Sequence, residues 1–247
     1  MDSLSDKNPL LKQIRRAVSR GALTEDGYAV AEGVHLLKEA RAAGCEIHAV
    51  IAMASVAEDF PEARVVSDKA FRDLASTETP QGVMALVRPP KWTLEQMVNG
   101  NALMVALDGV QDPGNAGAIL RAAEAFGATG AVFLKGTVNP YNPKCLRGSA
   151  GSVFRLPIVA AVEPEVFLDR APKALYAAMP RAQKLASEAD LAAPCAIVIG
   201  SEARGVGAAV EARSIGVRIP TCGVESLNAA VAAGILLYEA RRQRGKR

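Results

Sequence analysis

Apolar residues near the start of the chain recur at the spacing of a helix. Between Leu10 and Val18 they share one face, and three cationic residues lie off it: Lys12, Arg15 and Arg16. A second helix is expected over about 33–43. Short apolar runs predict strands at 47–51, 63–66 and 82–87. This alternation predicts a small α/β/α sandwich.

Two consecutive prolines, Pro89 and Pro90, mark a boundary, because proline ends a strand and cannot continue a helix. We therefore expect an N-terminal domain over 1–90, a linker over 91–100 and a second domain over 101–247. In the second domain, apolar runs predict strands at 102–107, 131–134, 174–178, 196–199 and 217–219. Helices are expected over 116–126 and from about 226 onward. Strands separated by helices predict an α/β fold with a parallel sheet.

Composition supports this fold class and excludes several others. Half of the 247 residues are hydrophobic and only 4% are aromatic, so the core is built from Ala, Val, Leu and Ile. The four cysteines are scattered and there are two histidines, so no zinc site is expected, and a reducing cytoplasm fits. No apolar stretch is long enough to span a bilayer. The net charge is +3, but basic residues gather over 7–20 and 241–247, as either a phosphate-binding surface or solvated helix ends.

Unusual polar residues stand at three predicted strand-to-helix junctions. The first is LDGVQDPGNAGAILRAAEAFG, in which Asn115 is a candidate helix cap. A glycine-rich turn before a helix can bind an anion, and Arg121 would add a bidentate phosphate contact. Alternatively, Arg121 is a surface residue paired with Glu124.

The second junction, AIVIGSEARGV, carries Glu202 just after a buried strand, where a carboxylate could also stabilise the next helix. The third, RIPTCGVESLNAAVAAGILLYE, carries Ser226 and Asn228, for which helix capping is the alternative role. Motifs of other enzyme classes are absent. The sequence lacks the G-x-G-x-x-G of dinucleotide-binding folds, the P-loop and the G-x-S-x-G nucleophile elbow.

In this order, the three junctions resemble the three signature motifs of the SpoU/TrmH family in the SPOUT superfamily. The N-terminal segments NPLLKQIRRA, AEG and TETPQGVMALV are similar to the family's RNA-binding domain, which resembles kink-turn-binding ribosomal proteins. The resemblance implies a trefoil knot in the second domain, a homodimer formed through the knot region, and transfer of a methyl group from S-adenosylmethionine to an RNA ribose 2′-hydroxyl.

The resemblance also assigns residues. The implied catalytic positions are Asn115, Arg121, Glu202, Ser226 and Asn228. The implied cofactor-binding positions are Ala178, Gly200, Ile219, Pro220 and Leu227. RNA binding is expected at Lys12, Arg15 and Arg16. The sequence departs from the family pattern at Ala203, where glycine is common, at Thr221, where methionine is common, and in the short 221–224 loop.

Large-subunit ribosomal RNA is the favoured substrate, because the chain carries the additional N-terminal domain. A tRNA substrate, a methylase that confers resistance to a ribosome-directed antibiotic, and a non-catalytic RNA-binding protein on the same fold remain open alternatives. A nicotinamide-dependent oxidoreductase is the alternative from another class, and it predicts nicotinamide binding.

Overall fold

The computed structural model describes residues 4–5 and 8–245. Contacts within the chain divide it into two units. The first comprises the residues up to Pro90 together with Pro140–Arg155, and the second comprises Lys91–Asn139 and the chain from Leu156 onward. The expected second domain, 101–247, includes the segment Pro140–Arg155, which by its contacts groups with the first unit instead.

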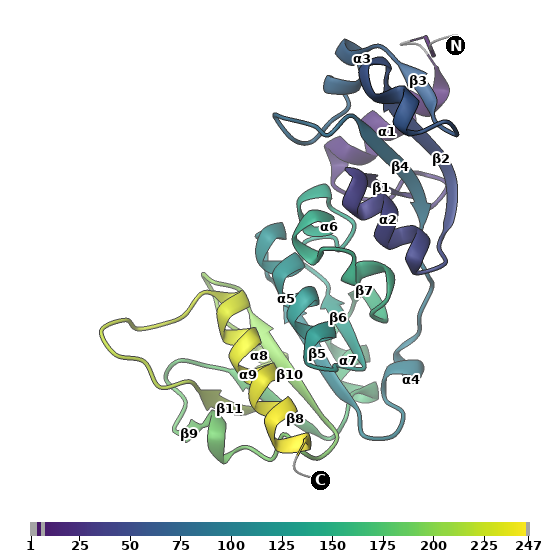
Figure 1. Ribbon diagram of the computed structural model, residues 1–247. Helices are drawn as coiled ribbons and strands as arrows, with labels where there is room; N and C mark the ends of the chain where they lie inside the picture. Colours follow the sequence, from purple (N-terminus) through teal and green to yellow (C-terminus); the bar gives the residue numbers. More distant parts are fainter. Residues whose placement is uncertain (1–3, 6–7, 246–247) are drawn as a thin grey trace. The chain divides into compact units, whose positions relative to one another are not determined.

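A mixed four-stranded sheet forms the centre of the first unit within the described residues (Figure 1). Its strands are β1 (Ala29–Glu32), β2 (Glu46–Met53), β3 (Arg64–Val66) and β4 (Val83–Arg88), in the order β1-β4-β2-β3. Only β2 and β3 pair in parallel. Side chains from α1 (Pro9–Arg20) and α3 (Asp68–Arg72) join alternate strand residues in one core, while α2 (Val34–Ala42) contacts β1, β2 and β4 without joining that core. Helices on both faces confirm the predicted sandwich.

Local signals at both ends fix helix α1. The Asn8 side chain accepts a hydrogen bond from the Leu10 backbone N–H at 2.9 Å, and Pro9 occupies the first helical position. Gly21 ends the helix with φ of 61°, a left-handed conformation that favours glycine. Ile14 on the predicted apolar face is fully buried. The predicted amphipathic helix is therefore confirmed.

Two features of the first unit have no counterpart in the sequence analysis. One is strand β1, and the other is the segment with α6 (Pro143–Ser149) and a 3₁₀ turn (Ser152–Phe154), which reaches the unit from the second half of the chain. Glu32, only 7% exposed, accepts hydrogen bonds from the Ser76 backbone and hydroxyl and from Thr77, and Arg147 of α6 lies 3.8 Å from it. This buried carboxylate gives the segment a charged partner in the first unit.

Seven parallel strands form the sheet of the second unit, again counting described residues. Its strands are β5 (Leu103–Asp108), β6 (Gly130–Leu134), β7 (Ile158–Val162), β8 (Ala174–Ala178), β9 (Lys184–Leu185), β10 (Cys195–Gly200) and β11 (Ile215–Arg218). The order is β7-β6-β5-β10-β8-β11-β9. The predicted parallel sheet is confirmed, with β7 and β9 as strands that the sequence analysis did not predict.

Helices cover both faces of this sheet. On one face α5 (Pro113–Ala125) packs against α9 (Ala229–Arg244) and both contact the strands. On the other face α4 (Leu94–Met97), α7 (Pro164–Arg170) and α8 (Ala208–Glu211) supply side chains to a second core. A short 3₁₀ turn at Ala186–Glu188 also belongs to this unit, and another at Ala54–Asp59 belongs to the first unit. Because β5, β10, β8 and β11 are parallel neighbours, their carboxyl ends and following loops share one edge of the sheet.

The start of α5 corrects one expectation. Asp112, not Asn115, is the N-cap, and its side chain accepts from the Asn115 backbone N–H at 2.8 Å. Pro113 takes the first helical position, so the helix begins three residues earlier than the predicted 116. Asn115 is thereby freed from capping, and its side chain is available for other contacts.

In the described part of the chain, no helix has the length and apolarity needed to cross a bilayer. No group of three or more His, Cys, Asp or Glu side chains among the same residues is placed to hold a metal ion.

Candidate active site

Three polar side chains from the three junctions form a hydrogen-bonded chain. Asn115 of α5 donates through Nδ2 to Glu202 Oε1 at 2.5 Å. It accepts through Oδ1 from Asn228 Nδ2 at 2.9 Å. The residues are 87 and 113 positions apart in the sequence, and the parallel sheet brings them to one edge. We call this chain of three residues the amide relay.

The loop after β10 positions Glu202. Ser201 and Gly205 exchange two backbone hydrogen bonds of 2.9 Å, which close a tight loop around Glu202. A Cβ on Gly200 would lie 2.2 Å from the Gly205 carbonyl carbon, so only glycine allows this closure. Beyond the loop, the Gly207 backbone N–H donates to Asp108 at 2.7 Å, which ties the loop to β5.

A cavity of about 710 Å³ opens beside this loop, between the segments that follow β8, β10 and β11. Four of the five expected cofactor positions line it: Ala178, Gly200, Ile219 and Leu227. Pro220, the fifth, is exposed and is not among the lining residues. Glu202 and Ser226 also line the cavity, whereas Asn115 and Asn228 do not.

The cavity contains charged residues that the sequence analysis did not single out. Arg181, after β8, pairs with Glu225, after β11, at 2.5 Å, and both line the cavity. Both side chains are more than 70% exposed, so the pair is screened by water. A Pro-Arg dipeptide after a strand is too common to point to a site, and only the parallel arrangement of β8 and β11 brings this arginine to Glu225.

The residues and dimensions of this cavity fit S-adenosylmethionine. Its volume is within the usual range for small-molecule sites. Ile199, Val206 and Leu227 offer apolar walls for a base, while Glu202 and Glu225 offer carboxylates for a cationic group. The substitution of glycine by Ala203 leaves the loop closed, and the Thr221 hydroxyl donates to the Val224 carbonyl at 2.8 Å, which orders the short loop.

Arg121, unlike the other four implied catalytic residues, belongs neither to the amide relay nor to the cavity lining. It lies exposed on α5 and does not line the cavity. The carboxylate of Glu202 accepts its hydrogen bond from Asn115. Within the described residues, no hydrogen bond or ion pair joins Arg121 to the amide relay.

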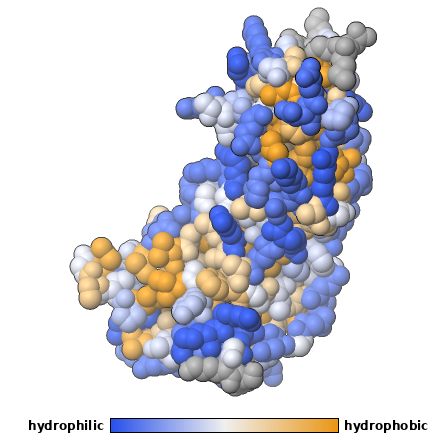
Figure 2. Space-filling model, viewed as in Figure 1, coloured by the Kyte–Doolittle hydropathy of each residue, from blue (hydrophilic) through white to orange (hydrophobic). Residues whose placement is uncertain are grey.

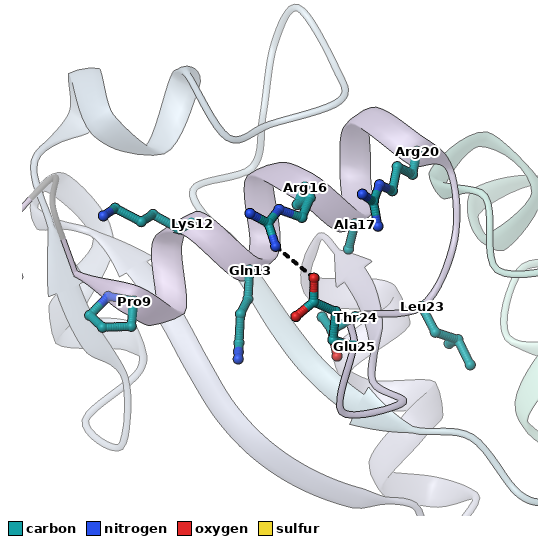
Figure 3. Close-up of a pocket in the computed structure, with 9 residues that line it drawn as sticks. All are labelled: Pro9, Lys12, Gln13, Arg16, Ala17, Arg20, Leu23, Thr24 and Glu25. Carbon is teal, nitrogen blue, oxygen red and sulfur yellow. Dashed lines mark hydrogen bonds and ion pairs between the residues drawn. The ribbon is translucent and has the colours of Figure 1, made fainter.

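The cationic residues of α1 lie in the first unit. Lys12 and Arg16 line a hollow of about 220 Å³, and Arg16 forms an ion pair with Glu25 at 2.6 Å (Figure 3). Arg15 is exposed on the same helix but does not line the hollow.

Two members of the C-terminal basic cluster, Arg242 and Arg244, make structural contacts. Arg244 donates to four backbone carbonyls, those of Asn101, Ala102, Leu191 and Ala193. Arg242 pairs with Glu239 at 2.6 Å. Lys246 and Arg247, which belong to the same cluster, lie outside the described residues.

Comparison with known proteins gives concordant results for both parts of the chain. Residues 102–238 match the SpoU rRNA Methylase family, and residues 8–85 match the MRM3-like substrate binding domain. The 23S rRNA (guanosine(2553)-2′-O)-methyltransferase RlmP of Bacillus subtilis is 30% identical, over 96% of this chain and 98% of its own length.

Two solved structures extend the likeness to nearly the whole chain. The SpoU methyltransferase AviRb from Streptomyces viridochromogenes, in complex with AdoMet, superposes with a TM-score of 0.86 at 28% identity, over 96% of this chain and 98% of that one. The AdoMet-bound rRNA methyltransferase from Sinorhizobium meliloti gives 0.82 at 30% identity, over 98% and 97%. With both segments matched and the three junctions gathered at one edge of a parallel sheet, the chain belongs to the SpoU rRNA methylase family.

Proposed function

We propose that this S-adenosylmethionine-dependent RNA ribose 2′-O-methyltransferase acts on a guanosine of 23S ribosomal RNA. The observation that carries the chemistry is the amide relay, with Glu202 on the wall of a cavity of suitable size. The substrate is inferred from the relative in Bacillus subtilis, whose name states that it methylates a 23S rRNA guanosine.

S-adenosylmethionine, when bound, supplies a methyl carbon made electrophilic by the adjacent sulfonium. Ala178, Gly200, Ile219 and Leu227 would hold it, since they line the cavity. A methyl transfer of this type is an in-line substitution, so fixing the direction of approach accounts for much of the acceleration. Residues that hold the ribose against the cavity are therefore expected to act by positioning.

The amide relay is suited to that task. Asn228 uses Oδ1 to cap α9, accepting from the Ala230 and Val231 backbones, while its Nδ2 donates to Asn115. One end of the relay is thus fixed to a helix and the other to the Glu202 loop. We assign Asn115, Glu202 and Asn228 to orienting the ribose, with Ser226 on the cavity wall as a hydroxyl within the same site.

Arg121 has a different role in this proposal. A guanidinium keeps its proton in proteins, so it does not serve as the general base. It clamps an RNA phosphate by a planar pair of hydrogen bonds, and the 2′-hydroxyl loses its proton to that phosphate or to water. Its exposed position on α5 leaves it accessible to RNA.

RNA affinity is assigned to the first unit through Lys12, Arg15 and Arg16, which are all exposed on α1. We infer in addition a trefoil knot in the second unit and a homodimer. Support for the dimer comes from Val231, Ile235 and Tyr238, which lie on one face of α9 and are 39–56% exposed. Figure 2 shows orange side chains gathered over α9, a surface that a second subunit could cover. A stable monomer in light scattering at micromolar concentration would contradict the dimer.

The decisive experiment compares ribose methylation across ribosomal and transfer RNA in cells with and without the gene. Loss of one 2′-O-methylguanosine from 23S rRNA is expected. Loss from tRNA instead would move the substrate to that class. If no methyl mark changes, and the purified protein transfers no tritiated methyl group to unmodified bulk RNA, the protein is a non-catalytic RNA-binding member of the family.

A further inference from the structure

The hollow beside α1 has the features of a site for a chain of phosphates (Figure 3). Lys12, Arg16 and Arg20 line it and are spaced by four residues, so they follow one another along one face of the helix. The rise between successive members is about 6 Å, which is similar to the separation of neighbouring phosphates along an RNA strand. Arg20 was not among the residues expected to bind RNA.

The opposite wall of the hollow is a rigid turn that carries acidic groups. Thr24 accepts the Tyr28 backbone N–H through its buried hydroxyl at 3.0 Å, and its own backbone N–H donates to the Tyr28 carbonyl at 2.8 Å. Arg88 donates to the Asp26 carbonyl at 3.2 Å. These contacts hold Glu25 in place opposite Arg16.

The three cations that line the hollow differ in their partners. Arg16 is paired with Glu25, and both side chains are about 60% exposed. Neither Lys12 nor Arg20 has a hydrogen-bond or ion-pair partner in the part of the chain that the structure describes. The helix face therefore presents two available cations, Lys12 and Arg20, one on each side of Arg16, which is already paired with Glu25.

We propose that this hollow binds the phosphate backbone of an RNA strand, and that Glu25 competes with a phosphate for Arg16. The inference rests on the proposed function, because it names how RNA is held by the unit that matches a substrate-binding domain. An exposed ion pair contributes little, so a phosphate that accepts two hydrogen bonds from the guanidinium displaces Glu25. Glu25 thereby lowers RNA affinity and restrains binding to RNA that cannot also contact Lys12 and Arg20.

The test uses the full-length protein and a fluorescently labelled single-stranded oligouridylate, titrated at several salt concentrations. Lys12→Gln and Arg20→Gln should each weaken binding and reduce the slope of log K against log salt by about 0.7. Glu25→Gln should tighten binding by up to about fivefold, the equivalent of one exposed ion pair. In the Arg16→Gln background, Glu25→Gln should have a smaller effect.

Arg72→Gln is the matched control, since it removes one exposed cation from α3 of the same unit, outside the hollow. It should leave the affinity within about twofold. If Arg72→Gln weakens RNA binding as much as Lys12→Gln does, the attraction is unspecific, and the proposal that the hollow binds RNA is overturned. If Glu25→Gln leaves RNA binding unchanged or weakens it, the proposed competition between Glu25 and a phosphate for Arg16 is overturned. Inorganic phosphate should displace the oligouridylate only weakly, and efficient displacement would identify a site for a free anion instead.

Two further measurements separate this inference from the proposed function. Thermal unfolding of each variant should match the wild type, because all substituted side chains are exposed. Tritiated methyl transfer to ribosomal RNA should be measured with the wild-type protein. If methyl transfer occurs but all variants bind RNA equally well, only the proposed RNA site in the hollow is wrong. If the variants of the hollow behave as expected but no methyl group is transferred, only the proposed function is wrong.

Discussion

Replacing Asn115 by aspartate tests the amide relay with almost no change of shape. Asn115 Nδ2 lies 2.5 Å from Glu202 Oε1, so Asn115→Asp would place two carboxylate oxygens at that separation. The bond accepted from Asn228 Nδ2, 2.9 Å long, could be retained. The substitution therefore removes one link of the relay and leaves the other.

The size of the effect follows from this distance. Two unit charges 2.5 Å apart repel by about 1.7 kcal/mol even with the dielectric constant of water, and loss of the hydrogen bond adds roughly 1 kcal/mol. The loop is thus expected to move away, at a cost of about 2–3 kcal/mol. If the transition state requires the relay, kcat falls by about 30- to 160-fold.

The assay is single-turnover methyl transfer to saturating ribosomal RNA, with cofactor affinity measured separately by calorimetry. Asn101→Asp is the control, because it adds the same charge at an exposed residue of the same unit that does not line the cavity. Its rate should stay within about twofold of the wild type. A folded Asn115→Asp protein with wild-type kcat would refute the positioning role of the relay.

Three further experiments have defined outcomes. Arg121→Lys should keep partial activity and Arg121→Ala much less, with the loss in kcat and no change in cofactor affinity; wild-type turnover by the alanine variant on saturating RNA would contradict the phosphate clamp. Arg244→Met should lower the free energy of unfolding by about 2–4 kcal/mol in urea titrations, because four carbonyls lose their donor. Arg242→Met should cost only about 1 kcal/mol, because Arg242 makes one ion pair and its side chain is 42% exposed. Burial raises the pKa of the Cys145 thiol to about 12. Iodoacetamide at mildly alkaline pH should therefore alkylate exposed Cys222 and spare Cys145, as read by mass spectrometry. Rapid labelling of Cys145 would contradict its burial. Because the folded pKa of Cys145 lies above its ordinary value of 9.0, its contribution to stability is complete below that pH and is lost as pH rises toward about 12.

The sequence predicted those parts of the fold that depend on local signals. Helix α1 has an asparagine cap, a proline at its first position and a glycine after its end, and each acts within a few residues. The strands with continuous apolar runs, such as β5 and β10, were predicted for the same reason. The three junctions could be expected to meet because parallel strands place their carboxyl ends at one edge.

Other features depend on contacts between distant residues and leave no local pattern. The assignment of Pro140–Arg155 to the first unit involves Arg147 and a buried Glu32 more than a hundred positions earlier. Strand β9 has only two residues, which is too short for a periodicity to be recognised. Likewise, nothing near Arg16 indicates that Glu25 holds it, because the contact requires the turn that Thr24 and Tyr28 close.

Asn228 shows why a sequence could not decide between a structural and a functional role at this site. From the sequence, capping and catalysis were alternative roles for Asn228, yet the two polar atoms of its carboxamide, Oδ1 and Nδ2, make separate contacts. Oδ1 accepts from two backbone N–H groups at the start of α9, and this fixes the side-chain orientation. With Oδ1 committed to the helix, Nδ2 can point only toward Asn115, which continues the relay to Glu202. The helix cap is therefore what positions the functional donor. Asn228→Asp, which keeps the acceptor and removes the donor, should preserve stability while lowering kcat, and a loss of stability with full activity would reverse this assignment.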